Sequence, residues 1–117
     1  MLNRLDDQLM ALLEFSVSPM GKGESVSEYV ARCVEIVESS GLDYEVHAMG
    51  TIVEGELDAV LDVMRRSIET VAADCERVSC TAKIDLRRGH QGAILNKVAS
   101  VERLVGHPAR RVGGQRE

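Results

Sequence analysis

The sequence predicts an α+β fold in which helices cover one face of an antiparallel sheet. Four segments alternate apolar and polar residues with the period of a β-strand, and three others repeat apolar residues at helical spacing. The link between the second and third strand segments is too short for a crossover, so these two form a hairpin. The resulting order is the ferredoxin-like βαββαβ plan with an extra C-terminal helix, in which strands one and three are central.

The composition fits one small globular domain and excludes several function classes. The chain has 117 residues, 44% of them hydrophobic and 28% charged. Its net charge of −5 and the absence of tryptophan argue against a nucleic-acid partner. No apolar run approaches the roughly 20 residues of a membrane span, and Asp6 and Asp7 do not suit a signal peptide. The three cysteines are odd in number and lack metal-ligand spacing, so we expect free thiols in a cytoplasmic protein.

The first half of the chain begins with a flexible leader, residues 1–8. The strand 9–17 follows, with Leu13, Phe15 and Val17 on one face. Ser25 and Glu28 have the spacing of a capping box and predict the start of the first helix, which runs to a glycine stop at residue 41. Residues 9–105 are expected to form the ligand-binding domain.

The second half begins with the predicted hairpin, formed by strands 44–49 and 51–56. Apolar residues at helical spacing over 57–72 predict the second helix, and alternation over 78–87 predicts the longest strand. A third helix is expected around 94–104. The remaining residues, 106–117, lack periodicity and are predicted to be a disordered basic tail.

With both crossover helices on one side, the other face of the sheet is expected to mix apolar, hydroxyl and charged groups. Such a face is seldom left open to water, so it predicts closure by a second subunit, by a ligand or by both. Its expected members are Leu12, Glu14, Ser16, Ser18, His47, Met49, Ile52, Glu54, Thr81, Lys83 and Asp85.

Glu14 and Glu54 are the first candidates for chemistry, because they lie on adjacent central strands and on the same face. They could hold a cation or accept hydrogen bonds from an amidine-like ring, or form interface salt bridges with Lys83 or Arg87. Ser16 and Ser18 would add neutral donors and acceptors near the end of the first strand.

His47 is the one histidine in a predicted regular element. It could act as a general base, but the pattern favours an interface or pocket histidine, since no nucleophile is placed beside it. The histidine spacing does not predict a metal site, and nothing in the pattern calls for a cofactor. The loop around Lys22 precedes a helix start and could hold an anion, or could be only a flexible surface loop.

Five motifs in order resemble the small thiamine-binding protein family, and together they span residues 9–105. The resemblance implies a non-catalytic ferredoxin-like subunit that pairs through its sheets, commonly into a homotetramer that is a dimer of dimers. It also implies binding of thiamine or its hydroxymethylpyrimidine part. The motifs are the ranges 15–21 (FSVSPMG), 25–31 (SVSEYVA), 49–56 (MGTIVEGE), 83–87 (KIDLR) and 97–102 (KVASVE).

The residues that match the family pattern imply a ligand site on strand one and the hairpin. A carboxylate there would offset the cationic thiazolium, while hydroxyls would bind the pyrimidine edge. A structural or regulatory assembly module is the alternative, and an enzyme using His47 is a third. The implied ligand-binding residues are Ser16, Ser18, Met49, Thr51 and Glu54, with Glu14 and His47 beside them.

Overall fold

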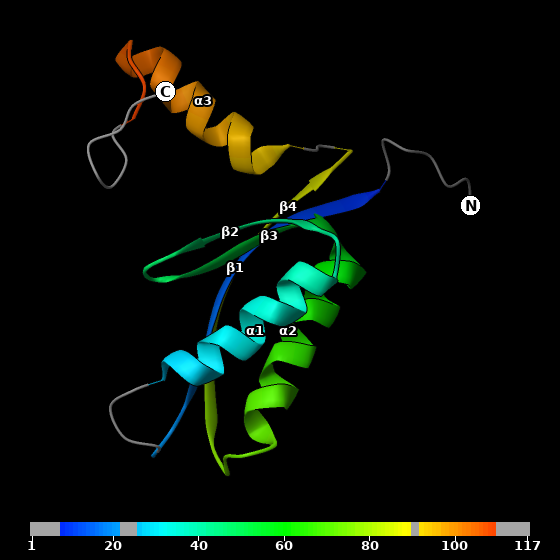
Figure 1. The fold of residues 1–117 in the computed structure, drawn as a ribbon. Coiled ribbons are helices and arrows are strands. Elements are labelled where there is room, and N and C mark those ends of the chain that lie inside the picture. Colours follow the sequence, from blue (N-terminus) through cyan, green and yellow to red (C-terminus); the bar gives the residue numbers. More distant parts are fainter. Residues whose placement is uncertain (1–7, 22–25, 90–91, 110–117) are drawn as a thin grey trace.

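The computed structural model describes residues 8–21, 26–89 and 92–109 (Figure 1). The four strands form one antiparallel sheet with the order β2-β3-β1-β4, which confirms the predicted ferredoxin-like α+β plan. The elements are β1 (Leu9–Pro19), α1 (Ser27–Ser39), β2 (Asp43–His47), β3 (Gly50–Glu56), α2 (Leu57–Ala72), β4 (Val78–Arg88) and α3 (Ala93–Val105).

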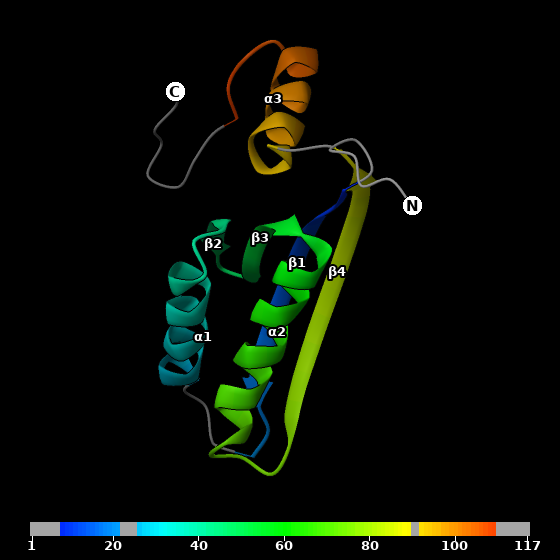
Figure 2. The same cartoon turned by 90° about the vertical axis from the view of Figure 1, so that its right-hand side faces the viewer.

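The core lies between the sheet and the helices α1 and α2, which both cover the same face (Figure 2). Leu13 of β1 and Val53 of β3 are cross-strand partners and have no exposed surface. Val37 of α1 and Val60 and Val71 of α2 are also fully buried. Burying each such side chain contributes about 1.5–3 kcal/mol, so the apolar periodicity that predicts these elements also forms the core.

We call the side of the sheet opposite α1 and α2 the bare face. It contains all the residues predicted for it except Met49. The register places Glu14 opposite both Ile52 and Lys83, and Leu12 opposite Glu54 and Asp85. Glu14 and Glu54 therefore share this face on neighbouring strands, as predicted. Met49 lies in the turn after β2, which ends at His47 and not at residue 49.

The predicted start of the first helix is wrong. The N-cap of α1 is Val26, which makes no side-chain capping bond. Glu28 lies one turn before Arg32 and forms an ion pair with it at 3.5 Å, which is the common i,i+4 arrangement on a helix surface. Ser25, Lys22 and His90 lie outside the described residues, as do most of the leader and the tail.

The last helix, α3, extends away from the rest of the molecule beyond one end of the sheet (Figures 1 and 2). It follows Gly92, whose positive φ of 72° favours glycine. None of its side chains is buried, and its apolar positions Leu95, Val101 and Leu104 are all exposed. Of the described helices, none is long and apolar enough to cross a membrane.

Candidate functional site

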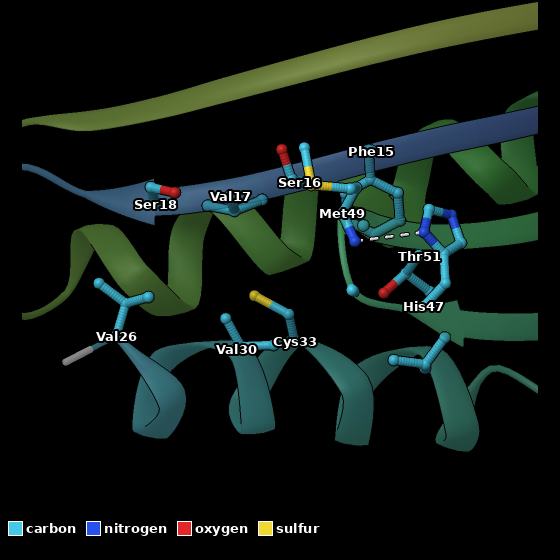
Figure 3. Close-up of a pocket in the computed structure, with 13 residues that line it drawn as sticks. Phe15, Ser16, Val17, Ser18, Val26, Val30, Cys33, His47, Met49 and Thr51 are labelled. Carbon is cyan, nitrogen blue, oxygen red and sulfur yellow. Dashed lines mark hydrogen bonds between the residues drawn. The ribbon is translucent and has the colours of Figure 1, made fainter. Parts of the chain in front are cut away.

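A cavity of about 300 Å³ opens between α1, the second half of β1 and the tip of the β2–β3 hairpin (Figure 3). We call it the hairpin pocket. Its walls combine apolar side chains from α1 with hydroxyl, imidazole and thioether groups from the strands. The lining residues are Phe15, Ser16, Val17, Ser18, Val26, Val30, Cys33, Val46, His47, Ala48, Met49, Gly50 and Thr51.

The pocket exists because the hairpin is shorter than β1. Pairing between β1 and β3 ends at Phe15 and Thr51, whereas pairing between β1 and β4 continues to Pro19 and Val78. Gly50 closes the hairpin against β1, and a Cβ there would lie 3.0 Å from the carbonyl oxygen of Phe15. Beyond this contact β3 no longer fills the space beside β1, and α1 forms the opposite wall.

His47 connects the hairpin tip to Glu14 of β1. Its Nε2 lies 3.1 Å from a carboxylate oxygen of Glu14, and its Nδ1 accepts a hydrogen bond of 3.3 Å from the main-chain N–H of Met49. An Nδ1 that accepts is unprotonated, so this arrangement favours the tautomer with hydrogen on Nε2. Figure 3 shows the bond between Met49 and His47 at the mouth of the pocket.

The α1 wall of the pocket is apolar and uncharged. Cys33 is buried, with its sulfur 3.7 Å from the carbonyl oxygen of Ser67, and burial raises the pKa of its thiol. A thiol with a raised pKa stays neutral near pH 7 and acts as a small apolar group. The cysteines are free, as predicted. The wall therefore suits the face of an uncharged ring.

The structure brings five of the seven predicted site residues together in the hairpin pocket and places a sixth beside it. Glu14 contacts His47 but lines a second cavity of about 480 Å³ on the bare face, which we call the sheet-face pocket. The five in the hairpin pocket are Ser16, Ser18, His47, Met49 and Thr51. The sheet-face pocket is lined by Leu12, Glu14, Ile52, Lys83, Ile84, Asp85 and Lys97.

Glu54, the seventh, lies beneath the start of α3, where its carboxylate caps that helix. Its two oxygens accept hydrogen bonds from the main-chain N–H groups of Ala93 and Ile94, at 2.8 and 3.2 Å. Glu54 is only 7% exposed, and free amides at a helix start favour a carboxylate. Nearby, Lys97 of α3 pairs with Asp85 of β4 and lowers the pKa of that carboxyl.

Sequence reasoning missed the contribution of α1 to the hairpin pocket. Val26, Val30 and Cys33 lie on the apolar stripe that predicts the helix, and periodicity alone assigns such residues to the core. The signal that could have found them is the difference in length between the first strand and the hairpin, which leaves the helix facing a gap in the sheet.

Comparison with known proteins places this architecture in a family. Residues 13–102 match the family model described as thiamine-binding protein. The chain belongs to the thiamine-binding protein family. It is 43% identical to a UPF0045 protein of Mycobacterium bovis over 101 residues, covering 86% of this chain and 99% of that one. A UPF0045 protein of Methanocaldococcus jannaschii is 38% identical over 91 residues, or 78% of this chain and 91% of the relative.

Solved structures of similar proteins have the same fold as this family member. A hypothetical protein from Methanocaldococcus jannaschii superposes with a TM-score of 0.73 at 37% identity, covering 79% of this chain and 95% of that one. A Thermotoga maritima protein described as a candidate for thiamine biosynthesis or salvage gives a TM-score of 0.69 at 25% identity, covering 79% and 98%. The motifs that suggest the family in the sequence therefore coincide with a shared fold.

Proposed function

We propose that the chain binds thiamine, or its hydroxymethylpyrimidine part, in the hairpin pocket and does so without chemical turnover. Membership of the thiamine-binding family supports a thiamine-related role, and so does the likeness to the Thermotoga maritima protein. The observation that carries the proposal is the gathering of Ser16, Ser18, His47, Met49 and Thr51 around one cavity.

The size and walls of the hairpin pocket suit a small heterocycle. Its volume of about 300 Å³ lies at the lower end of small-molecule sites, which enclose roughly 300–1,000 Å³. Val30 and Cys33 offer an apolar surface on the α1 side, while Met49 offers a polarisable thioether at the hairpin tip. The hydroxyls of Ser16 and Thr51 supply donors and acceptors for the edge of the ring.

Glu14 is the carboxylate we propose to offset the positive charge of the thiazolium. One of its oxygens is paired with His47, and the other has no ion pair with a described residue, so we propose that it faces a cation at the mouth of the pocket. Glu54 remains the other candidate from the sequence, but both of its oxygens already accept hydrogen bonds from α3. The net charge of −5 also favours a cationic ligand.

We further propose that two subunits pair through their bare faces and that two such pairs form a homotetramer in the cytoplasm. Leu12 and Ile52 give the centre of the bare face an apolar surface that α1 and α2 cannot reach. The exposed apolar side chains of α3, beyond one end of the sheet, add a further apolar surface. Exposed apolar surface of this kind is typical of a contact between copies.

Calorimetric titration with thiamine tests the binding proposal. Wild-type protein should bind with a micromolar dissociation constant or tighter, about −8 kcal/mol. Glu14→Gln should weaken binding about tenfold, because an interaction with a charged group contributes ~1.5–3 kcal/mol. Glu45→Gln is the matched control, since Glu45 is exposed on the same face and lines neither pocket. Absence of heat with the wild-type protein would refute the proposal.

The alternative function is an assembly module whose polar face serves only contact between subunits. The exposed stripe of α3 favours it, because that surface needs a partner whether or not a ligand binds. Sedimentation velocity separates the two functions when it is run with the titration. A tetramer that gives no heat with thiamine supports the assembly module, whereas a tetramer that binds thiamine supports the proposed function.

A further inference from the structure

Among the residues that the structure describes, the second half of β1 has a neighbouring strand on one side only, and its open side lines the hairpin pocket. β4 pairs with β1 as far as Pro19, whereas β3 ends its pairing at Phe15. An open strand edge presents main-chain N–H and C=O groups that can pair with another molecule. The groups of β1 beyond Phe15 are therefore candidates to bind whatever occupies the pocket.

The direction of these main-chain groups follows from contacts at both ends of β1. Gln8 accepts a hydrogen bond from the N–H of Gly89, and the N–H of Met20 donates to the carbonyl of Arg77, so even-numbered residues face β4. Main-chain groups of successive residues in a strand point to opposite sides, so odd-numbered residues face β3. The closeness of the Phe15 carbonyl oxygen to Gly50 agrees with this assignment.

Val17 is the residue at which both groups face the pocket. Phe15 is already opposite Thr51, and the main chains of Ser16 and Ser18 face β4, where these residues pair with Thr81 and Ser79. Pro19 faces the open side but has no N–H. Over residues 16–19, Val17 alone thus presents an N–H donor and a C=O acceptor, side by side, to the hairpin pocket.

We propose that the main chain of Val17 binds a heteroaromatic ring that carries an amino group next to a ring nitrogen. The carbonyl of Val17 accepts from the amino group, and its N–H donates to the ring nitrogen, so that the ring takes the place of the missing strand. This inference rests on the proposed function and deepens it, because the aminopyrimidine of thiamine has this donor and acceptor pair. The α1 wall then contacts the face of the ring.

The pairing explains why the pocket needs few charged groups. A main-chain N–H and C=O left without partners among apolar side chains cost free energy, and a ligand that satisfies both recovers it. The flanking hydroxyls of Ser16 and Ser18 then act on the ring substituents, while Glu14 lies outside the ring plane near His47. The main chain of Val17 therefore selects a ring whose amino donor and ring-nitrogen acceptor match its C=O and N–H.

The first experiment removes the N–H of Val17. Val17→Pro deletes that donor without breaking the ladder to β4, because the N–H faces the open edge where proline is tolerated. Val17→Ala is the matched control for the lost side chain. In calorimetry we expect Val17→Pro to bind thiamine at least tenfold more weakly than Val17→Ala, with unchanged circular dichroism. Equal affinities of the two variants would overturn the inference.

The second experiment keeps the protein unchanged and alters the ring, so it holds even if Val17→Pro does not fold. The probes are 4-amino-5-hydroxymethyl-2-methylpyrimidine and its 4-oxo counterpart, in which the order of donor and acceptor is exchanged. The wild-type protein should bind the amino compound at least tenfold more tightly. Equal binding of both probes overturns the inference but leaves the proposed function intact. Failure to bind either probe or thiamine overturns both.

Discussion

The two faces of the sheet bury their apolar side chains to different extents. On the face under α1 and α2, Leu13 and Val53 have no exposed surface. On the bare face, Leu12 and Ile52 are only half-buried, among charged neighbours. The helices α1 and α2 cover one face and complete one core, and the apolar side chains of the other face stay partly exposed. The hairpin pocket lies at the gap beyond the end of the hairpin, and the core residues Phe15, Val17 and Cys33 form part of its lining.

The largest difference between the two faces should appear in stability. Leu13→Ala should lower the free energy of unfolding by ~2–5 kcal/mol, because it leaves a cavity in a filled core. Urea denaturation in dilute solution measures this loss. Leu12→Ala is the matched control, because Leu12 is the preceding residue and lies on the bare face. It should lower the free energy of unfolding by clearly less. Equal losses at the two positions would remove the distinction between the faces.

A substitution on the exposed surface of α3 should affect the association of subunits more than the stability of a single subunit. Leu104 of α3 is 89% exposed, so Leu104→Glu should change the stability of a single subunit by less than about 0.5 kcal/mol. If α3 contributes to the subunit contact, the same change should raise the dissociation constant of the assembly at least tenfold, or ~1.4 kcal/mol. Sedimentation velocity measures the shift. Unchanged assembly would exclude this part of α3 from the contact.

Glu54 separates a structural role from a ligand-binding role. Glu54→Gln should weaken the cap on α3 and cost ~1 kcal/mol locally, as the loss of other helix caps does. Hydrogen exchange should become faster at the amides of Ala93 and Ile94, while thiamine affinity stays within about twofold of wild type. A tenfold loss of affinity would instead return Glu54 to the ligand site, as the sequence predicts.

The smallest expected effect is the loss of stability in acid that comes from the ion pair between Lys97 of α3 and Asp85 of β4. The pairing of Asp85 with Lys97 lowers the pKa of Asp85 in the folded protein. The stabilisation is therefore present above the ordinary carboxyl pKa and is lost as the pH falls through the lowered one. Following the carboxyl signal of Asp85 by NMR should show this lowered pKa, and Lys97→Met should bring it back toward the ordinary value. A titration unaffected by Lys97→Met would contradict the assigned cause.

Much of the fold could be predicted because strand and helix periods determine which face each residue occupies. The period of two in 9–17 and 51–56 correctly places Glu14 and Glu54 on one face, and the short hairpin link fixes the sheet order. Element ends were harder to predict. The capping box at Ser25 is a local pattern, and Val26 is the N-cap instead.

The site could be predicted only in part, because it depends on where a neighbouring strand stops. Residue patterns indicate that Ser16 and Met49 are suited to bind a ligand, but not that β3 ends beside Phe15 and leaves Val17 open. The role of Glu54 has a similar origin, since the amides it accepts from lie 39 and 40 residues away in the chain. Such contacts between distant segments have no local sequence signal.

A crystal structure of the thiamine complex tests the central claim most directly. We expect the pyrimidine ring in the hairpin pocket, with its amino group and ring nitrogen at about 2.7–3.2 Å from the main-chain oxygen and nitrogen of Val17. We expect the thiazolium on the side of Glu14. Thiamine bound in the sheet-face pocket, with the edge of β1 beside Val17 occupied only by water, would contradict the account.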